Sequence, residues 1–156
     1  MKELFKNKNY VLLFFGNFVS ELGNVIFGFV AGLYVADLTG RPSMLAIFMA
    51  LGAAVRIIAS PFAGVLVDRW NKVRIIYGTD FLRGVLFVGT AYLFYNGLNH
   101  TEATIVLLIV VGLSGLISAF FGPAVTSGTP EIVGVDKLQA ANGANSIVAS
   151  TTAIAG

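Results

Sequence analysis

The sequence predicts an all-α, polytopic membrane protein, because it is too apolar and too poor in charge for a soluble domain. Of its 156 residues, 56% are hydrophobic and 12% are charged, and the mean hydropathy is +0.84. An ordinary soluble domain is about 45–50% apolar and about 25% charged. The 18 glycines and 13 phenylalanines suit packed transmembrane helices. A spanning β-barrel would instead require short strands of alternating polarity.

Four apolar stretches are long enough to cross a bilayer, for which about 20 residues are needed. They are residues 10–36, 43–67, 73–95 and 103–125. A fifth stretch, 138–156, is rich in Ala, Ser, Thr and Asn and predicts only the start of a span, or a weak one. Clusters of turn-forming residues separate the stretches. These clusters are Thr39–Pro42, Asp68–Lys72, Asn96–His100 and Ser127–Pro130.

The basic residues predict how the chain is oriented in the membrane. With alternating spans, one side receives Lys2, Lys6, Lys8, Arg69, Lys72, Arg74 and Lys137. The other side receives only Arg41. Because short cytoplasmic loops carry the excess of Lys and Arg, we expect an integral protein of the plasma (inner) membrane with a cytoplasmic N-terminus.

Four charged residues lie in the interior of the predicted spans: Glu21, Arg56, Asp80 and Arg83. Each costs at least ~2.5–3.5 kcal/mol at the centre of a helix, so each is expected to face a partner or a water-filled cavity. Glu21 and Arg56 lie at similar depths, about 16 Å into the membrane at 1.5 Å per residue, and could pair across neighbouring helices. This predicts a carboxylate for proton coupling or substrate binding with a cationic partner. The alternative is a structural ion pair that only fixes helix packing.

Two further polar groupings follow helical spacing. Asn17, Glu21 and Asn24 share one face of the first span. Such a stripe either lines a substrate cavity or forms hydrogen bonds with other helices. Asp80 and Arg83 are three residues apart on the third span and also share a face. They are candidates for a gating or relay pair near the cytoplasmic side, or for a local pair that neutralises both groups.

The loop between the second and third spans reads Gly64-Val65-Leu66-Val67-Asp68-Arg69-Trp70-Asn71-Lys72-Val73-Arg74. It resembles the signature G-x-L-x-D-R-x-G-R-K of the major facilitator superfamily. The matching positions are Gly64, Leu66, Asp68, Arg69 and Lys72. Asn71 stands where glycine is usual, and asparagine tolerates a left-handed turn. Val73 stands where the signature has its last basic residue, and Arg74 follows one place later.

Simple physical roles are expected for this loop. Gly64 permits close approach of helices. Asp68 meets the positive end of a helix or a cation. The basic residues anchor the loop on the cytoplasmic side. The resemblance implies that the loop stabilises one alternating-access state.

Other segments are similar to the drug and siderophore exporters of this family, a branch that includes macrolide-efflux-like proteins. They are Phe5–Tyr10, Pro61–Trp70, Asp80–Arg83, Pro130–Val133 and Leu138–Asn142. The resemblance implies a twelve-span transporter built from two six-helix halves, of which residues 1–156 are an N-terminal fragment. It also implies efflux of a small amphipathic compound, drug-like or siderophore-like, by alternating access coupled to protons. The expected partners are the lipid bilayer, that compound, the proton and the missing C-terminal half.

One departure from the family directs attention to particular residues. Many proton-coupled drug antiporters carry an arginine in the fourth span, but residues 103–125 contain no charge. The coupling role is therefore expected among the intramembrane charges of the first three spans.

The apolar, charge-poor sequence leaves one alternative class of membrane protein open and argues against nucleic-acid-binding proteins and enzymes. A complete four-span protein that acts as an oligomeric exporter, or as a non-transporting membrane scaffold, is the alternative to a fragment. A net charge of +2 gives no basis for binding nucleic acid. No metal or other cofactor is indicated, since the sequence has no cysteine and a single histidine, His100. That lone histidine also argues against an enzyme with a Ser/His/Asp site.

Overall fold

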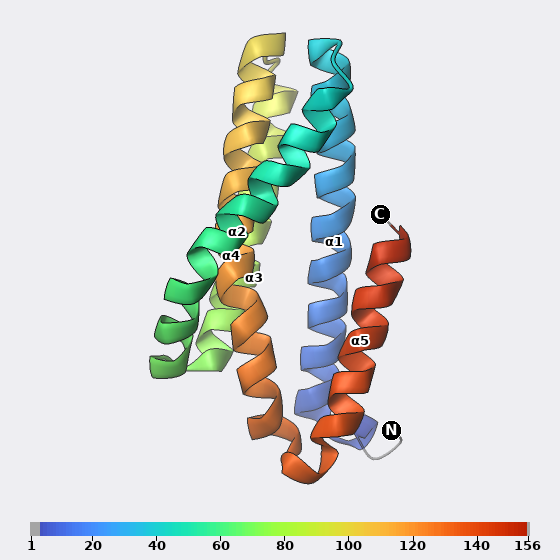
Figure 1. Ribbon diagram of the computed structural model, residues 1–156, viewed down its shortest axis with the longest axis vertical. Coiled ribbons are helices and arrows are strands. Elements are labelled where there is room, and N and C mark those ends of the chain that lie inside the picture. Colours follow the sequence, from blue (N-terminus) through green and yellow to red (C-terminus); the bar gives the residue numbers. More distant parts are fainter. Residues whose placement is uncertain (1–3, 156) are drawn as a thin grey trace.

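The computed structural model describes the backbone of residues 4–155, and the side chains of these residues except 135, 149 and 153–155. The predicted all-α fold is confirmed, and the described residues contain no β-strand (Figure 1). The elements are the 3₁₀ turns η1 (Leu4–Lys6) and η2 (Val135–Lys137) and the helices α1 (Lys8–Thr39), α2 (Ser43–Arg69), α3 (Lys72–Tyr95), α4 (His100–Val133) and α5 (Leu138–Ala155).

Asparagine begins three of the five helices. The side chains of Asn7, Asn71 and Asn99 each accept a hydrogen bond from a backbone N–H in the first turn of α1, α3 and α4 respectively. Such caps satisfy backbone donors that have no partner within the helix. At the other end of α1, Gly40 adopts a left-handed conformation with φ 62°, which glycine takes without a steric penalty. These local signals account for the boundaries of α1 and α3, which lie close to the predicted ones.

The fourth helix is longer than predicted. The cluster Ser127–Pro130 was expected to form a connector, but α4 continues through it to Val133, with Pro123 and Pro130 inside the helix. The Thr129 hydroxyl donates to the backbone oxygen of Val125 at 2.7 Å, so its polar group is satisfied within the helix. Gly128 is buried against α3, where an added Cβ would lie 3.5 Å from the Cβ of Lys72. Packing on α3 therefore overrides the local preference for a turn, and the chain turns instead at Gly134.

The helices form an elongated bundle in which α4 contacts all four other helices (Figure 1). The α1–α2 and α3–α4 connections lie at one end, and the N-terminal turn and the other two connections lie at the opposite end. One apolar cluster joins α1, α2 and α4 around Val35, Phe48 and Val111. A second joins α2, α3 and α4 around Val67 and Phe121. The contacts of α4 therefore hold the bundle together.

The backbones of α2 and α4 touch at a pair of glycines. A Cβ added to Gly115 would collide with the carbonyl oxygen of Gly52, and a Cβ added to Gly52 would lie 3.0 Å from a Val111 methyl group. Only glycine at position 115 allows this approach, which is the type of contact that small residues provide between membrane helices.

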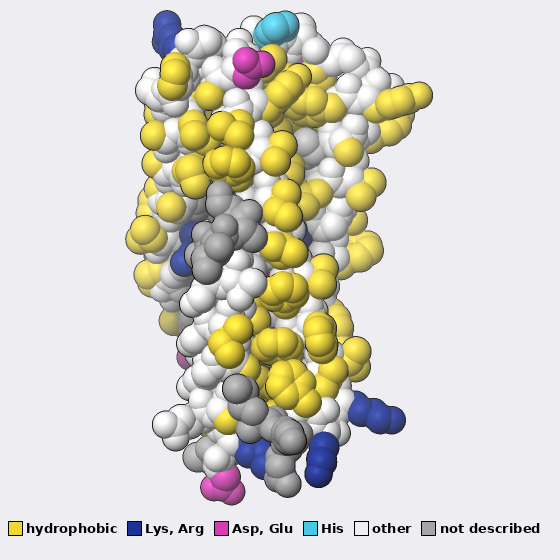
Figure 2. Space-filling view, turned by 90° about the vertical axis from the view of Figure 1, so that its right-hand side faces the viewer, with side chains coloured by type: hydrophobic (Ala, Val, Ile, Leu, Met, Phe, Trp, Pro, Cys, Tyr) yellow, Lys and Arg dark blue, Asp and Glu magenta, His cyan; other side chains and the backbone are white. Residues whose placement is uncertain are grey.

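Within the described residues, α1, α2 and α4 are long and apolar enough to cross a membrane. α3 has a suitable length, but Asp80 and Arg83 interrupt its apolar sequence and keep it outside this group. Figure 2 shows hydrophobic side chains over much of the wall of the bundle and several Lys and Arg side chains at its lower end. Large apolar side chains stay exposed on the wall, among them Ile57, Ile58, Phe62, Phe81 and Val88. Such a surface suits a lipid environment or further protein.

Candidate functional site

A chain of polar contacts links three helices inside the bundle. The Ser20 hydroxyl of α1 donates to Asp80 Oδ1 of α3 at 2.7 Å. Asp80 Oδ1 also lies 3.7 Å from a terminal nitrogen of Arg83. The other terminal nitrogen of Arg83 donates to the Ser118 hydroxyl of α4 at 3.2 Å. The shared face predicted for Asp80 and Arg83 is therefore present, and the pair also connects α1 with α4.

Arg83 is enclosed but not fully satisfied. Its side chain is only 4% exposed, and its guanidinium carbon lies 5.2 Å from the centre of the Phe121 ring, which is a cation–π contact. Among the described residues, its Nε and Nη1 atoms have no hydrogen-bond partner. A buried guanidinium with spare donors can exchange partners when neighbouring helices move.

Glu21 and Arg56 line one cavity of about 410 Å³ together with Asn17. The cavity is bounded by α1, α2, α4 and α5, and Thr126 and Asn145 add polar groups to it. The ion pair anticipated from the similar depth of Glu21 and Arg56 is not formed. The ion pairs between described residues are Lys72–Glu131 and Asp80–Arg83. Glu21 and Arg56 instead line the same cavity from α1 and α2 without forming an ion pair with each other.

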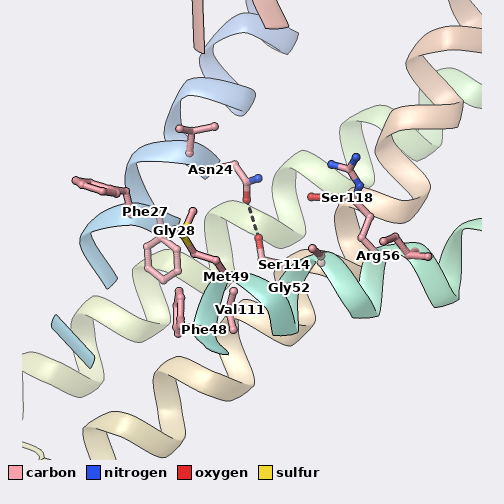
Figure 3. Close-up of a pocket in the computed structure, with 15 residues that line it drawn as sticks. Asn24, Phe27, Gly28, Phe48, Met49, Gly52, Arg56, Val111, Ser114 and Ser118 are labelled. Carbon is pink, nitrogen blue, oxygen red and sulfur yellow. Dashed lines mark hydrogen bonds between the residues drawn. The ribbon is translucent and has the colours of Figure 1, made fainter. Parts of the chain in front are cut away.

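Asn24 lies in an adjoining cavity of about 400 Å³ (Figure 3). Its side-chain oxygen accepts a 2.8 Å hydrogen bond from the Ser114 hydroxyl of α4. In Figure 3 the Arg56 side chain lies on the same side of the cavity as Ser118. Val25 and Arg56 line both cavities. The polar stripe predicted on the first span is therefore divided between two neighbouring spaces, with Arg56 common to both.

The loop motif forms a contact between helix ends. Lys72 Nζ lies 2.6 Å from Glu131 Oε1, which links the first turn of α3 to the end of α4. The left-handed turn considered for Asn71 is wrong, because its φ is −69°. Asn71 instead caps α3 by accepting a 3.1 Å hydrogen bond from the backbone N–H of Arg74. The asparagine thus suits a helix start that a glycine would cap less well.

Other motif positions differ from their expected roles within the described chain. A Cβ at Gly64 would meet no atom within 4 Å, so no close helix approach occurs there. Leu66 is half-buried, whereas Asp68, Arg69 and Arg74 are exposed. Asp68 makes no ion pair with the described residues.

Sequence reasoning overlooked several interactions. Ser114 and Ser118 were not among the predicted candidates, but both are hydrogen-bond partners of functional candidates. Gly52 and Gly115 carried no local signal that distinguished them from the other glycines. The polar composition of their segments could have indicated Thr126 and Asn145. It could not have shown that they lie beside Glu21.

These features define a class: a bundle of membrane-spanning helices with ionisable side chains facing internal cavities. The model of the family described as Major Facilitator Superfamily matches residues 2–156. The chain therefore belongs to the Major Facilitator Superfamily, a family of membrane transporters. No solved structure matches the chain significantly.

Curated relatives of this chain are named as exporters. It is 30% identical over 127 residues to the putative bacilysin exporter BacE of Bacillus subtilis, a match that covers 80% of this chain and 29% of that protein. It is 30% identical over 138 residues to the macrolide efflux protein A of Streptococcus pyogenes, covering 85% of this chain and 33% of the relative. The chain thus spans about a third of the length of the curated relatives it matches.

Reversing the charge at Lys72 should weaken the contact between α3 and α4. Lys72→Glu places two acidic groups together, and we expect a loss of about 1 kcal/mol in stability, since Glu131 is largely exposed and screened. Lys72→Glu combined with Glu131→Lys should restore the wild-type thermal midpoint of the full-length protein in detergent. If the double variant unfolds at the same temperature as Lys72→Glu alone, the two side chains do not interact.

Proposed function

We propose that residues 1–156 form the first part of the N-terminal six-helix half of an efflux transporter. The transporter moves a small amphipathic compound out of the cell by alternating access, coupled to proton entry. The observation that carries this proposal is Glu21, a carboxylate on a membrane-spanning helix that lines a cavity together with Arg56. A carboxylate at this depth is costly, and such residues commonly belong to proton or substrate pathways. The family, and the exporter names of the relatives, support the same function.

The polar network around Arg83 supplies a candidate gating or relay element for this cycle. Arg83 contacts Asp80 on its own helix and Ser118 on α4, and Ser20 of α1 bonds Asp80. A relative movement of α1, α3 and α4 would break or exchange these contacts.

We infer that the N-terminus lies in the cytoplasm of a cell whose plasma membrane holds the protein. The N-terminal turn and the α2–α3 and α4–α5 connections share one end of the bundle (Figure 1). This end carries most of the basic residues, whereas Arg41 lies at the other end. The excess of Lys and Arg at one end supports the cytoplasmic assignment.

Glu21→Gln should abolish proton-driven efflux, because the amide neither binds nor releases a proton at this position. The measurement is uptake of two amphipathic dyes, ethidium and rhodamine B, into inverted membrane vesicles that contain the full-length protein. An acidic vesicle interior supplies the driving force. We expect uptake above the protein-free background for wild type and background uptake for Glu21→Gln.

Asp37→Asn is the matched control, since Asp37 is an exposed carboxylate on the same helix outside both cavities. It should behave like wild type. Unchanged proton-driven uptake in Glu21→Gln would remove Glu21 from the coupling mechanism. If wild-type vesicles take up neither dye, efflux of amphipathic dyes is not the function.

A further inference from the structure

A separate cavity leads from the Asp80 carboxylate to the end of the bundle that carries the N-terminal turn. It has a volume of about 290 Å³ and lies between α1 and α3, with Ile132 of α4 at its edge. Asn9, Val73 and Ile132 belong to the first or last turns of their helices, whereas Asn17 and Asp80 lie about two turns deeper. A water molecule takes about 30 Å³ in the liquid, so several waters fit between Asp80 and this end of the bundle.

The Asp80 carboxylate has one oxygen available to this cavity. The hydrogen bond from Ser20 and the contact with Arg83 both use Oδ1. Between described residues, no hydrogen bond reaches Oδ2, and the Asp80 side chain is 28% exposed. A carboxylate that is held through one oxygen and faces water with the other can take up and release a proton.

The groups around Asp80 leave it as the proton carrier of this cavity. Its own helix adds Arg83 and Tyr77, α1 contributes the neutral Asn17, and α4 contributes Ile132. A guanidinium does not release its proton, and a phenol is a much weaker acid than a carboxylic acid. Among the described residues that line the cavity, Asp80 is the only one with a carboxyl group.

The cavity adjoins the one that contains Glu21. Asn17 lines both of them. Ser20, which donates to Asp80, is the residue before Glu21 in α1. The amide and the hydroxyl both donate and accept hydrogen bonds, so they can orient water between the two carboxyl groups.

We propose that Asp80 is the relay through which the coupling proton leaves Glu21 toward the end of the bundle that carries the N-terminal turn. Protonated Glu21 gives its proton to water and becomes a carboxylate. Asp80 accepts the proton on Oδ2, passes it to water in its own cavity and returns to a carboxylate. This inference rests on the proposed function and adds a residue to its coupling. Because the route runs beside the Glu21 cavity, the proton leaves while the transported compound occupies that cavity.

Access of water to Asp80 is tested by cysteine labelling in inverted vesicles, which present the cytoplasmic end of the full-length protein to the medium. Residues 1–156 contain no cysteine, and any cysteines elsewhere are replaced with serine. The reagent is sulfonatoethyl methanethiosulfonate, which does not cross membranes. We expect Asp80→Cys to react at least about tenfold faster than Phe81→Cys, because Phe81 is exposed on the apolar wall, where a thiol ionises poorly.

Gly16→Leu closes the route without changing a titratable group. Gly16 lines the cavity, and a Cβ there would meet nothing within 4 Å, so leucine enters free space. It should slow the labelling of Asp80→Cys. It should also lower net ethidium uptake driven by an acidic vesicle interior about a hundredfold, the smallest usual effect of a positioned proton-transfer group. Exchange of labelled for unlabelled ethidium without a pH gradient should stay at the wild-type rate, since exchange requires helix movement but no proton release.

Gly23→Leu is the matched control. Gly23 lies about two turns further along the same face of α1, outside this cavity, and a Cβ there would also meet nothing within 4 Å. Both net uptake and exchange should match wild type. A normal size-exclusion profile for each variant confirms that a loss of labelling or transport is not a loss of folding.

The outcomes separate this inference from the proposed function. Equal labelling of Asp80→Cys and Phe81→Cys, or wild-type net uptake in Gly16→Leu, would overturn the relay. Equal loss of exchange and net uptake in Gly16→Leu would assign that position to helix movement and also overturn it. Rapid labelling of Asp80→Cys in a protein that transports neither dye would support the access route and overturn the proposed function.

Discussion

Replacing Gly115 with leucine should separate α2 from α4 and strongly destabilise the bundle. A Cβ at this position collides with the backbone of Gly52, and a backbone cannot move aside as a flexible side chain can. We expect a loss at or above the upper end of the ~1–3 kcal/mol typical of overpacked cores. The measurement is the thermal midpoint of the full-length protein in detergent, together with its level in the membrane.

Gly112→Leu is the matched control for this prediction. Gly112 lies almost one turn earlier on α4, and a Cβ there would meet nothing within 4 Å. Both substitutions raise helix propensity by a similar amount, so the difference between them isolates the contact with Gly52. A Gly115→Leu protein as stable as Gly112→Leu would show that the close approach of α2 and α4 is absent.

Replacing Arg83 with methionine should be the most damaging change among the intramembrane charges. It removes the ion pair with Asp80, the hydrogen bond to Ser118 and the cation–π contact with Phe121. Removing one partner of a buried pair typically costs about 3–5 kcal/mol, because the other charge is left without compensation. We therefore expect a much lower thermal midpoint and no efflux.

A second substitution distinguishes the loss of the pair from the loss of Arg83 alone. Asp80→Asn combined with Arg83→Met removes the uncompensated carboxylate and should recover part of the stability. If the pair is a gating or relay element, efflux should stay absent in this double variant. Arg74→Met, on an exposed position of the same helix, serves as the control and should retain wild-type stability. Wild-type efflux in the double variant would make the pair purely structural.

The helices could be predicted from the sequence because their ends carry local signals. A residue such as Gly40 acts through its own backbone and its immediate neighbours, so composition and spacing reveal the helix end, although the cap that Asn71 forms was not predicted. The end of α4 could not be predicted in this way. Gly128 and Pro130 favour a turn locally, but the burial of Gly128 against Lys72 depends on a contact between distant parts of the chain.

The candidate site shows the same division between local and long-range information. The cost of a charge in the membrane was sufficient to select Glu21, Arg56, Asp80 and Arg83, and helical spacing placed the last two on one face. Helical rise gave Glu21 and Arg56 similar depths but not the distance between their helices. That distance depends on how α1 and α2 pack against α4, which no local pattern encodes. Hence the two residues share a cavity without forming the expected pair.

The measurement that tests the central claim most directly is proton movement during transport by the reconstituted full-length protein. Proteoliposomes containing a pH-sensitive dye are given a gradient of a transported compound without an imposed pH gradient. The proposed mechanism predicts that wild type and Asp37→Asn move protons against the flow of compound, whereas Glu21→Gln moves none. Movement of the compound without protons in wild type, or equal proton movement in Glu21→Gln, would contradict coupling through Glu21.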